Sequence, residues 1–220
     1  MKKRFKGEVS YIIFTPIMRL IFTLWYHPQI INKQNIPKKG PIIITSNHKH
    51  VYDQCHTIIA TKRPIHYMAK KEYFDGKFAW FFKMFGCISV NRKIKDYVAT
   101  NTAIEILKNN GAIGLFPEGT RNKTYDTLLL PFKFGAVSMA QKTGALIIPS
   151  CITGDYKFHS KNLMIRYGTP FKVPSDMDLT KANDKLRKEI EALINQNLKD
   201  SNRTKEEELK SRNQDQKNKV

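Results

Sequence analysis

A histidine and an aspartate five residues apart, His48 and Asp53, form the residue pair in this sequence best suited to acid–base chemistry. They follow an apolar run at residues 41–45, which has the composition of a buried strand. Ligands usually bind where such a strand ends and the chain turns towards a helix, so His48 should stand at a ligand site. A carboxylate beside an imidazole fixes its tautomer and stabilises its cation, and such a pair can draw a proton from a hydroxyl group.

A second segment, residues 86–92, predicts a short strand that begins after Gly86 and ends at Arg92. The Arg92 guanidinium would emerge at the same carboxyl edge as His48, where it can bind a phosphate through two parallel hydrogen bonds. Taken alone, the pattern is equally compatible with an ordinary surface arginine after a strand.

The third segment, Phe-Pro-Glu-Gly-Thr-Arg at residues 116–121, runs from a strand into a tight turn. Proline fixes φ, and Gly119 permits a positive φ or a close approach of the backbone, so this corner should be rigid. Arg121 would point from it towards a phosphate, and Glu118 towards a polyol hydroxyl or a neighbouring cation. The alternative is a simple loop salt bridge between these two side chains, but three polar corners at one edge favour a shared site.

A fourth segment and several lysines add to this edge. Residues 146–149 predict another strand, whose terminal Pro149 indicates a bend beside the site. Lys70, Lys71 and Lys133 lie near predicted strand or helix ends and are candidates for binding the same phosphate. For each of them, taken individually, the sequence favours an ordinary solvated lysine.

Composition limits the classes of partner. The chain has 220 residues, 41% of them hydrophobic, which suits one domain with a substantial core. Its 38 lysines and arginines against 19 acidic residues give a formal charge of +19. This excess implies an anionic partner, such as phosphate-bearing substrates, acidic lipid, an acidic carrier protein or nucleic acid. The three cysteines lie far apart in apolar stretches, which predicts buried reduced thiols in a cytosolic protein.

Residues 1–30 predict a basic and apolar membrane anchor. An apolar stretch at residues 9–26 is slightly short of the ~20 residues that span a bilayer. The basic residues before it are Lys2, Lys3, Arg4 and Lys6. On a helix, one polar stripe would form from Tyr11, Thr15, Arg19 and Thr23. An arginine at mid-membrane is costly, so the pattern favours a helix in the membrane plane. The alternative is a helix packed on the domain with the stripe outward.

After residue 28, short apolar runs alternate with helical patterns, which predicts an α/β fold: a single domain with a largely parallel or mixed sheet flanked by helices. Strands are predicted at residues 41–45, 65–69, 87–90, 112–116, 145–152 and 163–167. Helices are predicted at residues 56–61, 77–85, 95–109, 132–142 and 180–198. This domain would extend over residues 31–198. The charged tail at residues 199–220 has scarcely an aliphatic residue and is predicted to be disordered, with helix only at its start.

With these segments in order, the sequence resembles the phospholipid/glycerol acyltransferases, most nearly the bacterial 1-acylglycerol-3-phosphate O-acyltransferases. The resemblance extends from about residue 35 to residue 167. It rests on four blocks: Asn47-His48 with Asp53, residues 86–92, residues 116–121, and Ile148-Pro149. It implies a glycerol-3-phosphate acyltransferase-like fold.

The resemblance also implies roles for individual residues. His48 would be the catalytic base and Asp53 its orienting partner. The glycerol-phosphate part of the acceptor would be bound by Arg92, Glu118, Gly119, Arg121 and, as an addition found in some members, Lys70. The sequence departs from the family at Lys49-His50, where small or hydroxyl residues are frequent.

The reaction implied by the resemblance moves a fatty acyl group from acyl-CoA or acyl-ACP to the free hydroxyl of 1-acyl-sn-glycerol 3-phosphate. The product would be phosphatidate for phospholipid synthesis, and no cofactor or metal would be needed beside the acyl donor. The implied partners are lysophosphatidate, the donor and an anionic membrane surface, without nucleic acid, at the cytoplasmic face of the cell membrane. Another lysophospholipid or glycerol derivative as acceptor is an alternative within the family.

Two alternatives belong to other classes. The dense cluster of His48, His50, Asp53 and His56 contains zinc-type ligands, which would indicate a metal-dependent hydrolase. Its spacing does not match the HxHxDH pattern of metallo-β-lactamase-like enzymes. The charge of +19 would also suit a non-catalytic binder of nucleic acid or membranes. However, the sequence contains no helix-turn-helix, zinc-finger or aromatic-basic signature.

Overall fold

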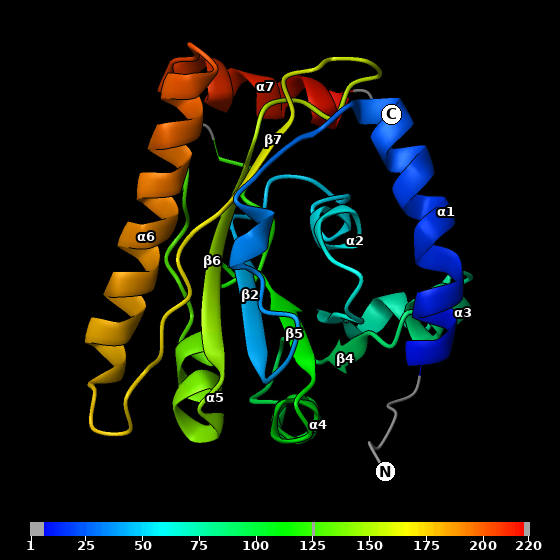
Figure 1. Ribbon diagram of the computed structural model, residues 1–220, viewed down its shortest axis with the longest axis vertical. Coiled ribbons are helices and arrows are strands. Elements are labelled where there is room, and N and C mark those ends of the chain that lie inside the picture. Colours follow the sequence, from blue (N-terminus) through cyan, green and yellow to red (C-terminus); the bar gives the residue numbers. More distant parts are fainter. Residues whose placement is uncertain (1–6, 125, 218–220) are drawn as a thin grey trace.

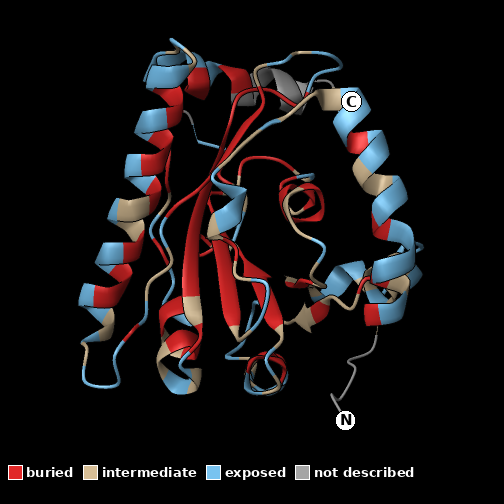
Figure 2. Cartoon of the chain, viewed as in Figure 1, coloured by how far each residue is buried: buried red, intermediate tan, exposed pale blue. Residues whose placement is uncertain are grey.

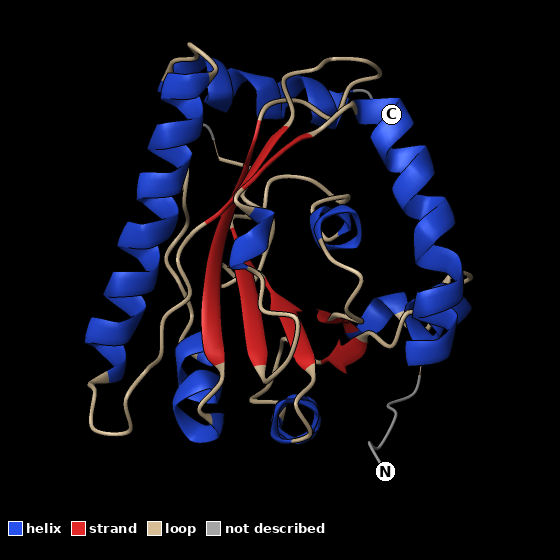
Figure 3. Ribbon diagram, in the orientation of Figure 1, coloured by secondary structure: helices blue, strands red, loops and turns tan. Residues whose placement is uncertain are grey.

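A computed structural model describes residues 7–124 and 126–217, and contains one seven-stranded sheet with helices on both faces (Figures 1 and 3). The strands are β1 (Gln29–Ile31), β2 (Ile42–Ser46), β3 (His66–Lys70), β4 (Ile88–Val90), β5 (Ala112–Leu115), β6 (Leu146–Thr153) and β7 (Met164–Tyr167). The α-helices are α1 (Glu8–Tyr26), α2 (Cys55–Ala60), α3 (Ala79–Met84), α4 (Tyr97–Lys108), α5 (Gly135–Thr143), α6 (Leu179–Asp200) and α7 (Lys205–Lys217). Single 3-10 turns are η1 (Lys33–Asn35) and η2 (Lys71–Tyr73).

The sheet has the strand order β1-β7-β6-β2-β5-β3-β4. All neighbours are parallel except β6 and β7, which pair antiparallel, so the predicted largely parallel or mixed sheet is confirmed. The six predicted strands are all present, with ends within one residue of the prediction, and the five predicted helices lie within three residues of theirs. Strand β1 was not predicted, because its three residues at the sheet edge are too few to show a periodic pattern.

The strands are apolar on both faces because both faces are covered. Ile43 belongs to a core shared with α4, α5 and α6, whereas its neighbours Ile42 and Ile44 belong to a second core shared with α1 and α2. Figure 2 shows the central strands buried along their length. The three cysteines are free, and burial raises the pKa of the Cys55 and Cys87 thiols to about 12.

Four adjacent parallel strands determine where the site can form. In the order β2, β5, β3 and β4 they run in the same direction, with Thr45 beside Leu115 and Lys70 beside Val90. Their carboxyl ends therefore share one edge of the sheet. The loops that leave this edge contain the first three sequence blocks, as the spacing of the strands predicted.

Helix α1 packs on the domain with its polar stripe inward. Tyr11 and Thr15 are buried, and the Arg19 guanidinium donates hydrogen bonds to the carbonyls of Ile58 (2.9 Å) and Thr61 (2.8 Å) at the end of α2. Gly7, just before α1, has φ +90°, and a Cβ there would stand 2.4 Å from the backbone nitrogen of Gly86. The alternative with the stripe outward is therefore wrong, because Tyr11 and Thr15 are buried and Arg19 binds carbonyls of the domain.

The opposite face of α1 is hydrophobic and exposed, as the outer side of the helix in Figure 2 shows. Its large side chains, each at least 42% exposed, are Val9, Ile12, Ile13, Phe14, Ile17, Leu20, Ile21, Leu24 and Trp25. Thr23, assigned to the polar stripe from the sequence, is exposed as well. Among the described residues, α1 is the one helix long and apolar enough to cross a membrane, judged by length and composition alone. The four basic residues predicted to flank it lie outside the described residues.

The tail differs from its prediction. Residues 205–217 form helix α7, which crosses the end of the molecule between α6 and α1 (Figure 1). Glu208, Leu209 and Ser211 are buried against the domain. Disorder was the wrong prediction for these residues. The helix is held on the domain by the buried Leu209 and by the buried ion pair of Glu208 with Lys49, and neither contact gives the repeating hydrophobic pattern that indicates a helix in the sequence. The domain limits at residues 31 and 198 stay predictions.

Candidate active site

The predicted histidine–aspartate pair forms in the loop between β2 and α2. His48 Nδ1 lies 2.8 Å from Asp53 Oδ2, and the His48 ring stacks on Phe116 at 4.0 Å between ring centres with 10° between the planes. The His48 side chain is 13% exposed. In the described part of the chain no group hydrogen-bonds its Nε2. With Nδ1–H donated to the carboxylate, Nε2 carries the lone pair and can accept a proton.

Asp53 is the centre of the loop. Its Oδ2 also accepts the backbone N–H groups of Lys49 and His50, both at 2.7 Å, and its Oδ1 accepts the Tyr156 hydroxyl at 2.8 Å. The side chain is fully buried. Burial opposes its ionisation, but the hydrogen bonds from His48, His50 and Tyr156 outweigh that cost and hold the pKa of the carboxyl below its usual value. Asp53 is therefore a fixed anion that orients the imidazole.

Tyr156 is a member of the site that sequence reasoning missed. It follows β6, 103 residues after Asp53. Burial and the charge of Asp53 raise its pKa well above 10, so the hydroxyl stays protonated and keeps donating to the carboxylate. Its ring also stacks on His50 at 4.6 Å. A lone tyrosine after a strand has no motif, and it reaches the site because β6 runs parallel beside β2 and ends at the same edge of the sheet.

Glu118 takes part in the architecture of the site. It is buried, its Oε1 accepts the backbone N–H of His48 at 2.7 Å, and its Oε2 accepts that of Leu130 at 2.9 Å. The carbonyl of His48 accepts the backbone N–H of Asn122 at 2.7 Å. The segment of residues 118–122 thus holds the backbone of His48 through two hydrogen bonds. A direct contact of Glu118 with substrate stays a prediction.

The predicted phosphate ligands lie on the same edge, at different distances from His48. Gly119 has the predicted positive φ, +71°, and a Cβ there would meet the stem of Lys133 at 2.8 Å. Arg121 is half-buried on the loop after β5, the strand next to β2. Arg92 is exposed after β4, and the three strand spacings between β2 and β4 amount to about 14 Å.

Lys70 ends β3 between these two positions. Its ammonium group lies 2.9 Å from Glu72 Oε1, and both side chains are about half exposed. An exposed pair of this kind is weak, so Lys70 can exchange its partner for another anion. The edge therefore presents cations from three neighbouring strands, with His48 at one end of the row.

The metal-hydrolase alternative is not supported. Both ring nitrogens of His56 are engaged by tyrosines, with Nδ1 2.7 Å from the Tyr167 hydroxyl and Nε2 accepting the Tyr67 hydroxyl at 3.0 Å. The ring of His50 packs against Tyr52 and Tyr156. Within residues 7–124 and 126–217, no three His, Cys, Asp or Glu side chains are arranged to hold a metal ion. The cluster is dense in sequence, but the fold disperses it.

The buried His56 predicts a loss of stability in mild acid. Burial lowers its pKa from 6.5 to about 4, so the folded protein keeps the ring neutral while an unfolded chain takes up a proton below pH 6.5. Stability therefore falls as the pH drops from 6.5 towards 4, and His56 alone should cost about 2 kcal/mol at pH 5 relative to pH 7.5.

Denaturant unfolding of wild type and His56→Gln at both pH values measures this difference. Asp53 does not interfere, because its lowered pKa preserves its contribution until the pH falls below about 3.8. Equal pH dependence of the two proteins would contradict the assignment to His56.

Comparisons with known proteins agree with this geometry. The acyltransferase family profile matches residues 27–153. The chain is 34% identical over 142 residues to the 1-acyl-sn-glycerol-3-phosphate acyltransferase of Borreliella burgdorferi, covering 63% of this chain and 56% of that protein. It is 32% identical over 140 residues to the Bacillus subtilis protein of the same name, covering 62% and 68%. The match to the Borreliella protein thus spans little more than half of that protein's length.

The fold is also similar to a solved one. The crystal structure of the 1-acyl-sn-glycerophosphate (LPA) acyltransferase PlsC from Thermotoga maritima superposes with a TM-score of 0.67 at 20% sequence identity. The superposition covers 85% of this chain and 78% of that chain. The two proteins therefore share their fold, as the sequence resemblance implied.

Proposed function

This chain belongs to the acyltransferase family, and we propose that it transfers a fatty acyl group from acyl-CoA or acyl-ACP to the free hydroxyl of 1-acyl-sn-glycerol 3-phosphate. One observation carries the proposal: a histidine hydrogen-bonded at Nδ1 to a buried carboxylate, with Nε2 unpartnered among the described residues, at a sheet edge lined with cations. That arrangement suits deprotonation of a hydroxyl on an anionic molecule.

In this reaction His48 Nε2 takes the proton of the acceptor hydroxyl while its oxygen attacks the thioester carbonyl. Asp53 holds the ring in the required tautomer and stabilises the imidazolium that forms. When the tetrahedral intermediate collapses, the thiolate leaves and can take up that proton. General-base help of this kind supplies about 10²–10⁴-fold in rate, and positioning of the two substrates supplies much of the rest.

The acceptor phosphate would be bound by Arg121, Arg92 and Lys70. A lysophosphatidate carries its phosphate one glycerol length from the reacting hydroxyl, so the cation next to the base, Arg121, is expected to contribute most. Its guanidinium suits bidentate binding of phosphate oxygens. The charge of +19 supports an acidic donor, an acidic acceptor and an acidic membrane alike.

Arg121→Ala should raise the KM for lysophosphatidate about tenfold or more, because a charge-assisted bidentate contact is lost, with a smaller change in kcat. Steady-state kinetics at varied acceptor concentration measure the effect. Lys123→Ala, an exposed cation two residues further on, is the matched control and should leave KM unchanged. An unaltered acceptor KM in Arg121→Ala would remove this residue from the phosphate site.

We also propose that α1 attaches the protein to the cytoplasmic face of the membrane while lying in its plane. The exposed hydrophobic face of α1 is continuous along the helix, and an apolar face of this extent suits burial in lipid. A spanning orientation would have to withdraw Arg19 from the carbonyls of Ile58 and Thr61 and expose it to hydrocarbon. Acceptor and product both reside in lipid, so a site held at the surface can receive them directly.

Membrane attachment predicts that Ile17→Glu together with Leu20→Glu weakens binding to vesicles. Both side chains are nearly 60% exposed, so the fold should tolerate the change, while each lost insertion costs about 1.5 kcal/mol or more, together over a hundredfold in partitioning. Sedimentation with vesicles of anionic phospholipid measures the bound fraction. Val98→Glu, on the exposed face of α4, is the control. Equal binding by all three proteins would argue against α1 as the anchor.

The proposed reaction is tested by incubating the purified protein with labelled lysophosphatidate and either acyl-CoA or acyl-ACP. Phosphatidate should form with at least one donor. Lysophosphatidylcholine, lysophosphatidylglycerol and glycerol 3-phosphate serve as competing acceptors. A higher kcat/KM for one of these would favour the alternative acceptor within the family, and hydrolysis of the donor without transfer would argue against the proposal.

A further inference from the structure

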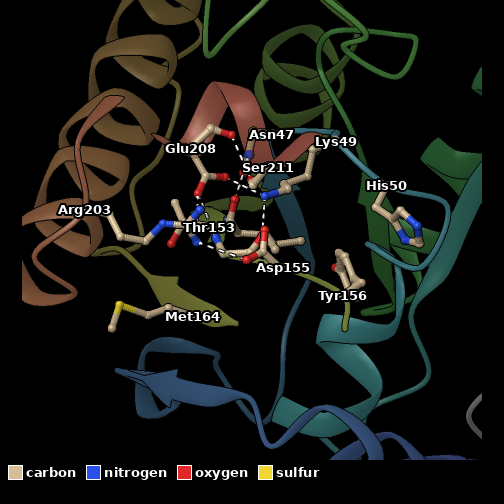
Figure 4. A network of polar contacts seen from close by, with 12 residues as sticks. Asn47, Lys49, His50, Thr153, Asp155, Tyr156, Met164, Arg203, Glu208 and Ser211 are labelled. Atoms are coloured by element: carbon tan, nitrogen blue, oxygen red, sulfur yellow. Dashed lines mark hydrogen bonds and ion pairs between the residues drawn. The ribbon is translucent and has the colours of Figure 1, made fainter. Parts of the chain in front are cut away.

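A buried ion pair ties the C-terminal helix to the loop that carries His48. Lys49, the next residue, turns its side chain away from the site, and its Nζ lies 2.5 Å from Glu208 Oε1 on α7. Both side chains are 1% exposed. Figure 4 shows Lys49 reaching from the loop into a group of polar side chains beneath α7, with His50 and Tyr156 on the other side. The proposed acyl transfer does not use either charge directly.

The pair is completed by the backbone at the end of β6. Lys49 Nζ donates to the carbonyl of Gly154, and the N–H of Gly154 donates to Glu208 Oε2 at 2.9 Å. Arg203 lies 3.6 Å from the same carboxylate oxygen and 3.7 Å from Asp155. Gly154 has φ +82° and a Cβ there would collide with the Asn162 carbonyl, so only glycine fits at this position. Lys49 is thus held by the Glu208 carboxylate and the Gly154 carbonyl.

Asn47, the residue before His48, is also held in place, in this case by strand β6. The Asn47 side chain donates to the carbonyl of Ile152 at 2.9 Å and accepts the N–H of the same residue at 2.8 Å. His48 therefore stands between one neighbour bound to β6 and another bound to α7. The Lys49 backbone N–H, in turn, donates to Asp53 Oδ2, so displacement of Lys49 would disturb the carboxylate that orients the imidazole.

We propose that Glu208 is a positioning residue for the base: acting through Lys49, it fixes the loop in which His48 meets Asp53. This inference rests on the proposed function for its kinetic consequence but not for its structural one. It assigns a part in the reaction to a helix outside the residues 27–153 that match the family profile. It also gives Lys49, a departure from the family pattern, a defined partner.

Breaking the pair leaves Lys49 without its carboxylate, or Glu208 with only the more distant Arg203, whereas a neutral replacement of both members avoids this imbalance. The full-length variants are therefore Glu208→Gln, Lys49→Met and the double variant Lys49→Met/Glu208→Gln. In the double variant the amide oxygen can still accept the Gly154 N–H. Asp200→Asn is the control, because it weakens another ion pair between a C-terminal helix and the sheet, that of Arg166.

Two measurements are made on each protein. The first is kinetic: both single variants should lose about tenfold or more in kcat with KM values for acceptor and donor within twofold, the double variant should recover most of that loss, and Asp200→Asn should stay near wild type. The second is hydrogen exchange of the Lys49 and His50 amides, which donate to Asp53. These should exchange about tenfold faster in the single variants and return towards the wild-type rate in the double variant.

The outcomes separate the two proposals. A wild-type protein without acyl transfer would refute the proposed function, and the exchange of the two loop amides would still decide whether Glu208 positions the loop. Single variants that unfold at lower temperature but keep wild-type kcat and wild-type exchange at Lys49 and His50 would overturn the inference, since the pair would then serve stability alone. Equal loss of kcat in Asp200→Asn would overturn it as well.

Discussion

His48→Ala should lower kcat for acyl transfer by about 10³-fold, within the 10²–10⁴ range that a positioned general base supplies. The alanine removes the group that accepts the hydroxyl proton, and no other described side chain beside Phe116 can take its place, because the nearest imidazoles, His50 and His56, are both held by tyrosines. Acceptor KM should change little, since the cations on the neighbouring loops remain.

Steady-state kinetics with labelled lysophosphatidate measure this loss. His159→Ala, at an exposed position in the loop before β7, is the matched control and should keep wild-type kcat. Melting temperatures of both variants establish that the fold is retained. Transfer by His48→Ala at the wild-type rate would show that another group takes the proton, and the mechanism proposed for this site would then be wrong.

Asp53→Asn should lower kcat by at least about 10²-fold, for a reason that differs from loss of the base. The site around Asp53 consists of donors: His48 Nδ1–H, two backbone N–H groups and the Tyr156 hydroxyl. An asparagine can place its amide oxygen where Oδ2 stands and turn its NH₂ group to the Tyr156 hydroxyl oxygen, which accepts as well as donates. The contacts are then kept but the negative charge is lost, so the imidazolium that forms when His48 takes the proton is no longer stabilised.

A graded comparison distinguishes this loss of charge from a general loosening of the loop. Tyr156→Phe removes one neutral donor to Asp53 but leaves the carboxylate and the imidazole proton in place, so its effect on kcat should stay within about tenfold. Asp53→Asn should also melt at a lower temperature than Tyr156→Phe, because two backbone amides lose their anionic acceptor. An Asp53→Asn protein no slower than Tyr156→Phe would contradict the orienting role.

The parts of the site that could be predicted from sequence are those fixed by short spacings. His48 and Asp53 lie five residues apart on one loop, so their contact requires only a local turn. The cations follow short, mostly apolar strands, and parallel neighbours must end at one edge. Glu118 lies beside the backbone of His48, but the hydrogen bonds it accepts from the N–H groups of His48 and Leu130 depend on how two loops meet, which composition does not encode.

Other features depend on contacts between distant segments. The orientation of α1 was ambiguous because the same polar stripe suits an outward face in water or an inward face on the domain, and only the carbonyls at the end of α2 decide between them. Helix α7 did have a local signal that went unused: Thr204 and Glu207 form a capping box, with Glu207 N–H donating to Thr204 Oγ1 and Thr204 N–H to Glu207 Oε2. Its attachment through Glu208 could not have been foreseen.

The inward stripe of α1 has a practical consequence for anyone wishing to obtain a water-soluble version of this enzyme. Deletion of α1 would expose Ile58 and Ile59, which belong to the second core. It would also remove the Arg19 guanidinium that donates hydrogen bonds to the carbonyls of Ile58 and Thr61. The shortened protein would lose the exposed hydrophobic face of α1 but would expose the hydrophobic residues that α1 covers. A better route to a soluble protein is to keep α1 and to substitute polar residues on its exposed outer face.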